Sequence, residues 1–214
     1  GSVAAAFFQG VTLGAYIQGM PVEGRSYAGG ALDWLTPFSL FTGAGLVAAY
    51  ALLGSTWLIM KTQGGLQARA GRITRVLVWL LLGVIAVISV WTPLVDPAIA
   101  ARWFALPQLF CFLPVPLLVA GAGWLLLRAL RRGQQTAPFL CTLALVFLGY
   151  TGLGISVWPN IIPPSVSIWE ASSPPQSQGF TLVGALFIIP VILMYTVWSY
   201  YVFRGKVLPE DGYH

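Results

Sequence analysis

The chain has 214 residues, of which 57% are hydrophobic and only 8% are charged, and its net charge is +5. A soluble globular protein carries about a quarter charged residues and amphipathic helices. The composition therefore excludes that class and indicates a membrane protein. The positive charge does not indicate nucleic-acid binding, because the cations lie in short gaps between apolar runs, where the orientation signals of membrane proteins belong.

Six apolar runs follow one another along the chain, and none contains Asp, Glu, Lys, Arg or His. The runs are Val3–Ile17, Pro37–Met60, Val76–Val90, Leu106–Leu127, Ala137–Val157 and Phe180–Phe203. Most are close to the ~20 residues that a helix needs to cross a hydrocarbon layer of ~30 Å. We predict an all-α fold, a polytopic transmembrane bundle of about six helices forming a single domain over residues 1–214.

The basic residues alternate between the gaps. Nine of the eleven lie in the second and fourth gaps and in the C-terminal tail, and two in the first and third gaps. The nine are Lys61, Arg69, Arg72, Arg75, Arg128, Arg131, Arg132, Arg204 and Lys206. Because basic loops stay on the cytoplasmic side, we predict that the C-terminus is cytoplasmic and that the first, third and fifth gaps face outward.

The fifth gap is the segment that indicates more than a scaffold. Residues 158–175 combine paired prolines with the carboxylate of Glu170 beside the ring of Trp169. Proline fixes φ and removes a hydrogen-bond donor, so we expect a stiff, ordered outer loop. Trp169 and Glu170 are our candidates for structural residues of that loop; a solvated carboxylate is the competing interpretation.

Few residues inside the runs suggest chemistry. Cys111 and Cys141 each lie in an apolar run and are most simply small buried hydrophobic residues. The sole histidine is His214, and Met20, Met60 and Met194 have no obvious partner. We therefore predict that this chain holds no haem or metal and no catalytic or cofactor-binding residue. The lack of titratable groups in the runs also argues against a complete proton path.

Glycines and prolines shape the expected packing. Gly10 and Gly14 have the spacing that allows close helix approach, as do three further groups of glycines. These are Gly43 with Gly45, Gly121 with Gly123, and Gly149, Gly152 and Gly154. Pro114, Pro116 and Pro190 lie within the runs, and we expect them to kink their helices.

Four stretches spread along the chain resemble subunit II of the bacterial cytochrome bd-type quinol oxidases, with the cyanide-insensitive branch the most similar. They are Phe8–Gly19 (FQGVTLGAYIQG), Leu35–Leu40 with Gly43, the loop 158–175, and Ile189–Tyr201 (IPVILMYTVWSYY). The resemblance covers nearly the whole chain in the order of the family.

The resemblance implies a roughly nine-helix subunit of which these would be the last six, the N-terminal helices being absent. It also implies a partner subunit I that holds the b and d haems in the inner membrane of a bacterium, within a complex that oxidises quinol and reduces O₂. Subunit II would be haem-free and would support assembly and proton or O₂ access. The choice of quinone, a structural quinone or lipid in subunit II, and a small accessory subunit stay open.

Two other functions stay open from the residues. A stand-alone transporter for a neutral solute would use the proline-interrupted helices as gates, although such carriers often show inverted repeats and we find none. A purely structural membrane-assembly protein is the third reading. Haem and quinol-oxidase activity on purification with native partners would separate the oxidase subunit from both.

Overall fold

The computed structural model describes residues 1–24, 26–95, 97–106, 110 and 112–206. Its helices are α1 (Ser2–Gln18), α2 (Pro37–Lys61), α3 (Gly64–Val95), α4 (Pro97–Phe104), α6 (Pro114–Arg131), α7 (Ala137–Val157) and α8 (Pro175–Val202). Two small antiparallel hairpins join β1 (Val22–Glu23) to β2 (Ser26–Tyr27), and β3 (Asn160–Ile162) to β4 (Val166–Ser167). The predicted helical membrane bundle is confirmed.

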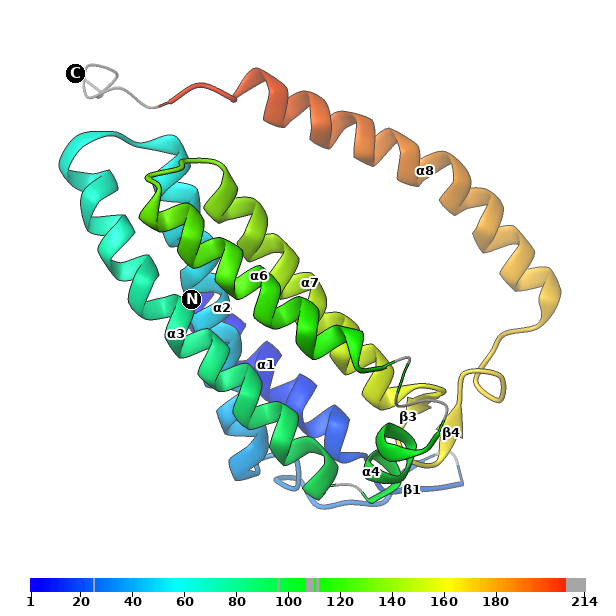
Figure 1. The fold of residues 1–214 in the computed structure, drawn as a ribbon. Helices are drawn as coiled ribbons and strands as arrows, with labels where there is room; N and C mark the ends of the chain where they lie inside the picture. The colour runs from blue at the N-terminus through cyan, green and yellow to red at the C-terminus, as the bar shows by residue number, and fades with distance from the viewer. Residues whose placement is uncertain (25, 96, 107–109, 111, 207–214) are drawn as a thin grey trace.

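Four of the helices, α2, α3, α6 and α7, pack side by side as a bundle (Figure 1). Each supplies a fully buried aliphatic side chain to one core, namely Leu52, Val78, Leu126 and Leu145. The buried hydroxyl of Thr74 on α3 lies within hydrogen-bonding distance of two acceptors, Ser55 Oγ on α2 at 2.9 Å and Ala70 O in its own helix at 2.8 Å. Such hydroxyl contacts join helices in a solvent that offers no hydrogen bonds.

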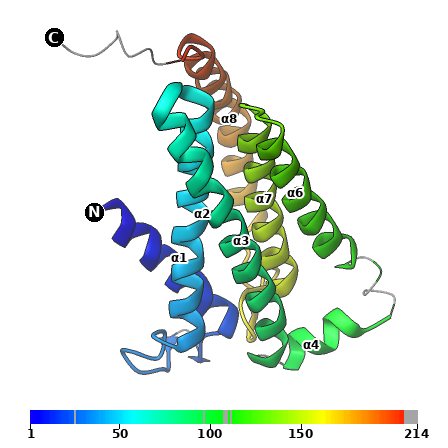
Figure 2. The ribbon, with the colours of Figure 1, turned by 60° about the vertical axis from the view of Figure 1, so that its left-hand side comes forward.

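Helix α1 packs obliquely on α2 and begins beside the middle of the bundle (Figure 2). Small residues make the approach close. A Cβ placed on Gly14 would lie 2.6 Å from Ser39 Cα, and one on Gly10 would lie 2.8 Å from Gly43 Cα. The packing role predicted for these glycines is confirmed. Among the described residues nothing lies within 4 Å of a Cβ added to Gly121, Gly149, Gly152 or Gly154, so the structure shows no packing role for these four within this chain.

Five described helices are long and apolar enough to cross a membrane: α2, α3 up to Leu94, α6, α7 and α8. The sixth expected span, α1, has 17 residues, which reach about 26 Å at 1.5 Å per residue, slightly less than a hydrocarbon core. The run Ala137–Val157 matches α7.

Two predicted boundaries differ from the structure. Helix α3 has 32 residues and includes Arg69, Arg72 and Arg75, which were expected in a gap. Arginine is a good helix former, so the helix continues beyond its apolar run. Helix α6 begins at Pro114, so Pro114 and Pro116 occupy its first turn, where proline is tolerated, and cause no kink inside it. The earlier part of the predicted span Leu106–Leu127 includes residues outside the described ones.

The bundle has two distinct ends (Figure 1). At one, which we call the basic end, lie the α2–α3 turn, the α6–α7 turn and the C-terminus of α8; the hairpins and α4 lie at the other, the hairpin end. Three cations at the basic end lie over aromatic rings: Lys61 over Trp57 (5.2 Å to the ring centroid), Arg128 over Trp124 (5.0 Å) and Arg204 over Tyr201 (4.0 Å).

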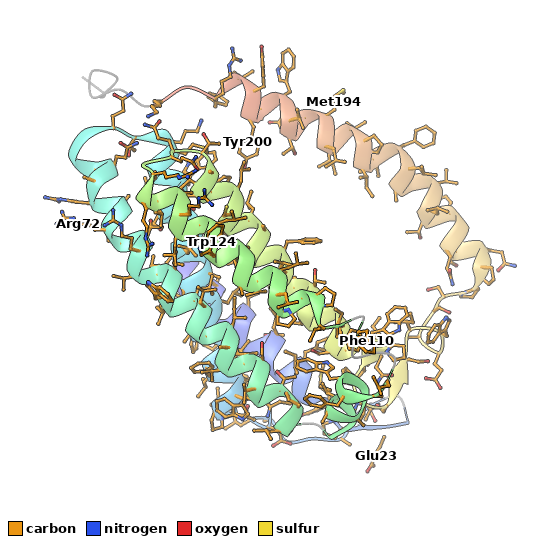
Figure 3. All side chains as sticks on the ribbon, viewed as in Figure 1. Glu23, Arg72, Phe110, Trp124, Met194 and Tyr200 are labelled. Atoms are coloured by element: carbon orange, nitrogen blue, oxygen red, sulfur yellow. The ribbon has the colours of Figure 1, made fainter. Side chains whose placement is uncertain are left out.

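Helix α8 stands apart from the bundle (Figure 1). None of its residues is buried. Within the described chain, its hydrogen bonds and ring contacts to the bundle all lie at its C-terminal end. Lys61 Nζ donates to Phe203 O at 2.6 Å and to Gly205 O at 3.2 Å, and the rings of Trp57 and Tyr200 meet at 5.9 Å. Figure 3 shows Tyr200 reaching from α8 toward the bundle.

Candidate functional site: the loop between α7 and α8

The loop between α7 and α8 lies at the hairpin end and is built on the β3–β4 hairpin. Asn160 pairs with Ser167 and Ile162 with Val166, with a register shift between them. Beyond the hairpin, Ile168 N donates to Pro159 O at 3.0 Å, which closes the chain on itself. The prolines leave few free backbone donors, so the loop is ordered by a small number of specific hydrogen bonds.

Glu170 and Ser167 form reciprocal hydrogen bonds, in which each residue both donates to the other and accepts from it. The carboxylate oxygen Oε2 of Glu170 accepts from Ser167 N and from Ser167 Oγ, both at 2.8 Å, and Glu170 N donates to Ser167 Oγ at 3.3 Å. This is the arrangement of a capping box at the start of a helical turn. The backbone hydrogen bond from Ser167, followed by that of its hydroxyl, lowers the pKa of Glu170 below its ordinary value, because both favour the charged form.

Trp169 lies beside this pair and is largely exposed, at 64%. Its ring meets that of Trp158 edge to face, with centroids 5.8 Å apart and an interplanar angle of 77°. Ser172 Oγ donates to Trp169 O at 2.8 Å and fixes the next turn. The two rings form an aromatic surface at the hairpin end, where amphipathic rings settle at headgroup depth.

The loop is attached to the end of α1, a contact that the sequence analysis did not predict. Tyr16 Oη donates to Ile161 O at 2.7 Å, and Met20 N donates to Pro163 O at 2.9 Å. Gly19 has φ +87°, and a Cβ there would lie 2.9 Å from Pro163 O. Glycine is the residue that adopts this conformation at low cost. The juxtaposition of Gly19 with two adjacent prolines is a tertiary signal with no local pattern to reveal it.

The side chains considered as possible haem or metal ligands are Met20, Met60, Met194, Cys111, Cys141 and His214. No group of three or more His, Cys, Asp or Glu side chains gathers in the described part of the chain. Met20 and Met60 are half-buried and Met194 is exposed, and Met194 points away from the bundle in Figure 3. Cys141 is a free, half-buried thiol, while Cys111 and His214 lie outside the described residues.

A second polar group, which the sequence analysis also missed, lies within the helices. Tyr50 Oη on α2 donates to Gln9 Oε1 on α1 at 3.2 Å, and the side chain of Tyr150 on α7 lies close to that of Tyr50. The only sequence signal was the amide of Gln9 in an apolar run. Three helices have to come together before the two tyrosines form a cluster with it.

The comparison with known families decides what this assembly of helices and loop is. The family model described as cytochrome bd terminal oxidase subunit II matches residues 1–203. The chain belongs to this family. With its long apolar helices, membership makes this cytochrome bd subunit II chain a multi-pass protein of the bacterial inner membrane.

Two curated relatives illustrate the match to cytochrome bd subunit II. Cytochrome bd-I ubiquinol oxidase subunit 2 of Escherichia coli (strain K12) is 25% identical over an alignment of 248 positions, gaps included. The alignment covers 94% of this chain and 62% of the relative. Cytochrome bd ubiquinol oxidase subunit 2 of Bacillus subtilis (strain 168) is 22% identical over an alignment of 225 positions, gaps included. That alignment covers 99% of this chain and 63% of the relative. The chain thus spans less than two thirds of the length of these curated relatives.

Proposed function

We propose that this chain is the haem-free subunit II part of a cytochrome bd-type quinol:O₂ oxidoreductase of the aerobic respiratory chain. The observation that carries the proposal is the family match over residues 1–203. The names of the relatives add the substrate, because both are subunits of ubiquinol oxidases. The partner is a haem-bearing subunit I, and a small accessory subunit, a structural quinone, membrane lipid and quinol are further proposed partners.

The proposed role of this chain is support of subunit I, since the haems b and d would lie there. A haem ligand normally comes from an inward-facing His, Met or Cys, and the only histidine in the sequence is residue 214. The six apolar runs contain no titratable carboxylate, amine or imidazole. A relay inside a membrane needs such groups, so these helices would contribute packing and an access route for O₂ or protons without completing a proton path.

Orientation follows from charge. Because basic segments stay in the cytoplasm, we propose that the basic end, with the C-terminus of α8, is cytoplasmic and that the α7–α8 loop faces the periplasmic side. In that loop Glu170 and Trp169 would hold the chain conformation that subunit I meets during assembly. This role is supported by the hydrogen bonds between Ser167 and Glu170 and by the exposure of the Glu170 side chain.

The test is purification of the chain with its native partners from membranes. The complex should carry haem absorbance and oxidise quinol with O₂, whereas the isolated polypeptide in detergent should lack a Soret band. Glu170→Gln should lower the yield of assembled complex while the haem spectrum of assembled molecules stays normal. Full assembly with an altered haem spectrum would instead assign Glu170 to the chemistry, and purification without any haem-bearing partner would refute the proposed function.

A further inference from the structure

The arginines of α3 and α6 at the basic end have no acidic partner in the described part of the chain. Three acidic residues are described, and all lie in loops at the hairpin end: Glu23, Asp33 and Glu170. Arg75 and Arg131 are exposed and have no hydrogen-bond or ion-pair partner among the described residues. Arg128, also exposed, contacts the ring of Trp124 and no carboxylate there. The positive charge of these three groups is therefore left for a ligand to balance.

Arg75 lies on the side of α3 that faces α6. A Cβ placed on Gly123 of α6 would lie 3.0 Å from Leu82 Cδ1 of α3, so the two helices touch at this point. Arg75 precedes Leu82 by seven residues, or two helical turns. It therefore lies on the same face, about 10 Å nearer the basic end. Trp79 follows Arg75 by four residues and is 63% exposed, which places this strip of α3 on the outside of the bundle.

The facing strip of α6 has the same character. At 100° per residue, the buried Leu126 lies on the core side of Gly123, whereas Trp124 and Arg131 lie on the other side. Trp124, Arg128 and Arg131 have the spacing i, i+4, i+7 and share one exposed face. The guanidinium carbon of Arg128 is held 5.0 Å from the ring centroid of Trp124. This face of α6 therefore borders α3 on the outside of the bundle.

The two strips place their charges at one depth. Measured from the contact between the helices, Arg75 on α3 lies about 10 Å toward the basic end, and Arg128 and Arg131 on α6 lie about 8 and 12 Å toward it. Trp79 and Trp124 lie nearer the contact, about 4 and 2 Å from it. Indole rings settle at the headgroup level of a membrane. The three guanidinium groups are thus at the depth of lipid phosphates.

An apolar surface continues from this site toward the middle of the membrane. Ala86 and Val90 follow Arg75 by eleven and fifteen residues, so they lie on nearly the same face of α3. Both are exposed and line an apolar hollow on the surface of that helix. Ala86 is about 16 Å from the level of Arg75, close to the depth of one leaflet in a hydrocarbon core of ~30 Å. An acyl chain that starts at the arginines would end at this hollow.

We propose that the outer face of the α3–α6 contact binds one anionic phospholipid, whose phosphate accepts hydrogen bonds from Arg75, Arg128 and Arg131. Guanidinium groups match the oxygens of a phosphate in geometry and charge, and basic clusters between membrane helices bind anionic headgroups. A zwitterionic headgroup would bring an ammonium group beside three cations with no described carboxylate near them, so the site favours a lipid of net negative charge. This inference goes beyond the proposed function and does not depend on where the haems lie.

The test uses the complete oxidase in lipid nanodiscs that contain phosphatidylglycerol or phosphatidylcholine with a photoreactive diazirine at the end of one acyl chain. Adducts are located by mass spectrometry of peptides. At equal mole fractions, the phosphatidylglycerol probe should label the segment around Ala86 and Val90 about fivefold more than the phosphatidylcholine probe, as expected for roughly 1 kcal/mol of headgroup preference.

Arg75→Gln should remove most of this preference, and Arg131→Gln replaces it if that variant does not assemble. Arg72→Gln is the matched control, because it removes the same charge from α3 while Arg72 points away from α6 in Figure 3. The preference should change by less than about twofold in the control, since salt screens a charge that does not contact the headgroup.

Equal labelling by the two probes would overturn the proposal, as would an equal loss of preference in Arg72→Gln and Arg75→Gln. Loss of the adducts in excess inorganic phosphate would assign the arginines to a soluble anion instead. A complete lack of lipid adducts on α3 would mean that protein covers this face. Haem content and quinol oxidation, measured on the same nanodiscs, report separately on the proposed function.

Discussion

Both hydrogen bonds that join the end of α8 to the bundle come from one side chain, so Lys61→Met should loosen the last turn of that helix. The final carbonyls of any helix lack partners within the helix. Here the ammonium group of Lys61 donates to Phe203 O and Gly205 O from a position 142 residues earlier in the chain. Methionine keeps much of the length and apolar character of the side chain and removes the charge and both hydrogen bonds.

The magnitude follows from these contacts. A cation at a helix C-terminus contributes about 0.3–1 kcal/mol, and a hydrogen bond to a charged group about 1.5–3 kcal/mol when it is well shielded. Lys61 is only half-buried, so water competes for the ammonium group and we expect about 1 kcal/mol in total. That free energy corresponds to a roughly fivefold change in the ratio of closed to frayed last turns.

Hydrogen exchange measured by mass spectrometry, with the protein in lipid nanodiscs, reports this ratio directly. Exchange of the amides of residues 200–205 should accelerate about fivefold in Lys61→Met, as expected for a loss of about 1 kcal/mol. Lys206→Met is the matched control, because Lys206 makes no hydrogen bond or ion pair among the described residues. Equal acceleration in both variants, or none in Lys61→Met, would refute the role of Lys61 as a cap.

Three further predictions use other parts of the molecule. Gly14→Ala should destabilise the protein by about 1–3 kcal/mol in thermal unfolding because its Cβ would meet the backbone of α2, whereas Gly83→Ala, with open space around it, should be neutral or slightly stabilising. The lowered pKa of Glu170 means that its contribution to loop order is present above the ordinary value of 4.5 and is lost as the pH falls through the lower folded value. Tryptophan fluorescence should show that acid transition in the wild type and not in Glu170→Gln. Reporter fusions at Gly133 and Ser173 should report opposite sides of the membrane; the same side for both would mean that the number of crossings is wrong.

The sequence predicts well those helices whose apolar run ends where the helix ends. Helix α7 matches its run, and α2 matches within one residue, because Thr36 and Pro37 start α2 with a capping box and a proline in its first turn. Hydropathy marks the part of a helix that lipid surrounds, which is why it missed the arginine-bearing start of α3. It also missed α4, a short helix with no membrane to cross.

The candidate sites also differ in whether a local sequence pattern reveals them. The pair of Ser167 with Glu170 has a local signature, a serine followed three residues later by a glutamate, and could have been predicted from sequence. The attachment of Gly19 to Pro163 and the meeting of Gln9 with Tyr50 join residues that are distant in the chain. No periodicity encodes such contacts, because they depend on how whole helices pack.

The cation–aromatic pairs at the basic end have a consequence for how the protein responds to bilayer thickness. Each pair places a ring at a depth that favours the headgroups and a charge just beyond it. Because the pairs come from α2, α6 and the end of α8, three helices are fixed to one plane. Among the described residues, the hairpin end shows aromatic rings and no such cation–ring pair, so it is then the end that adjusts. In a thinner bilayer the helices would tilt or the lipid would deform there, at the α7–α8 loop, while the basic end keeps its depth.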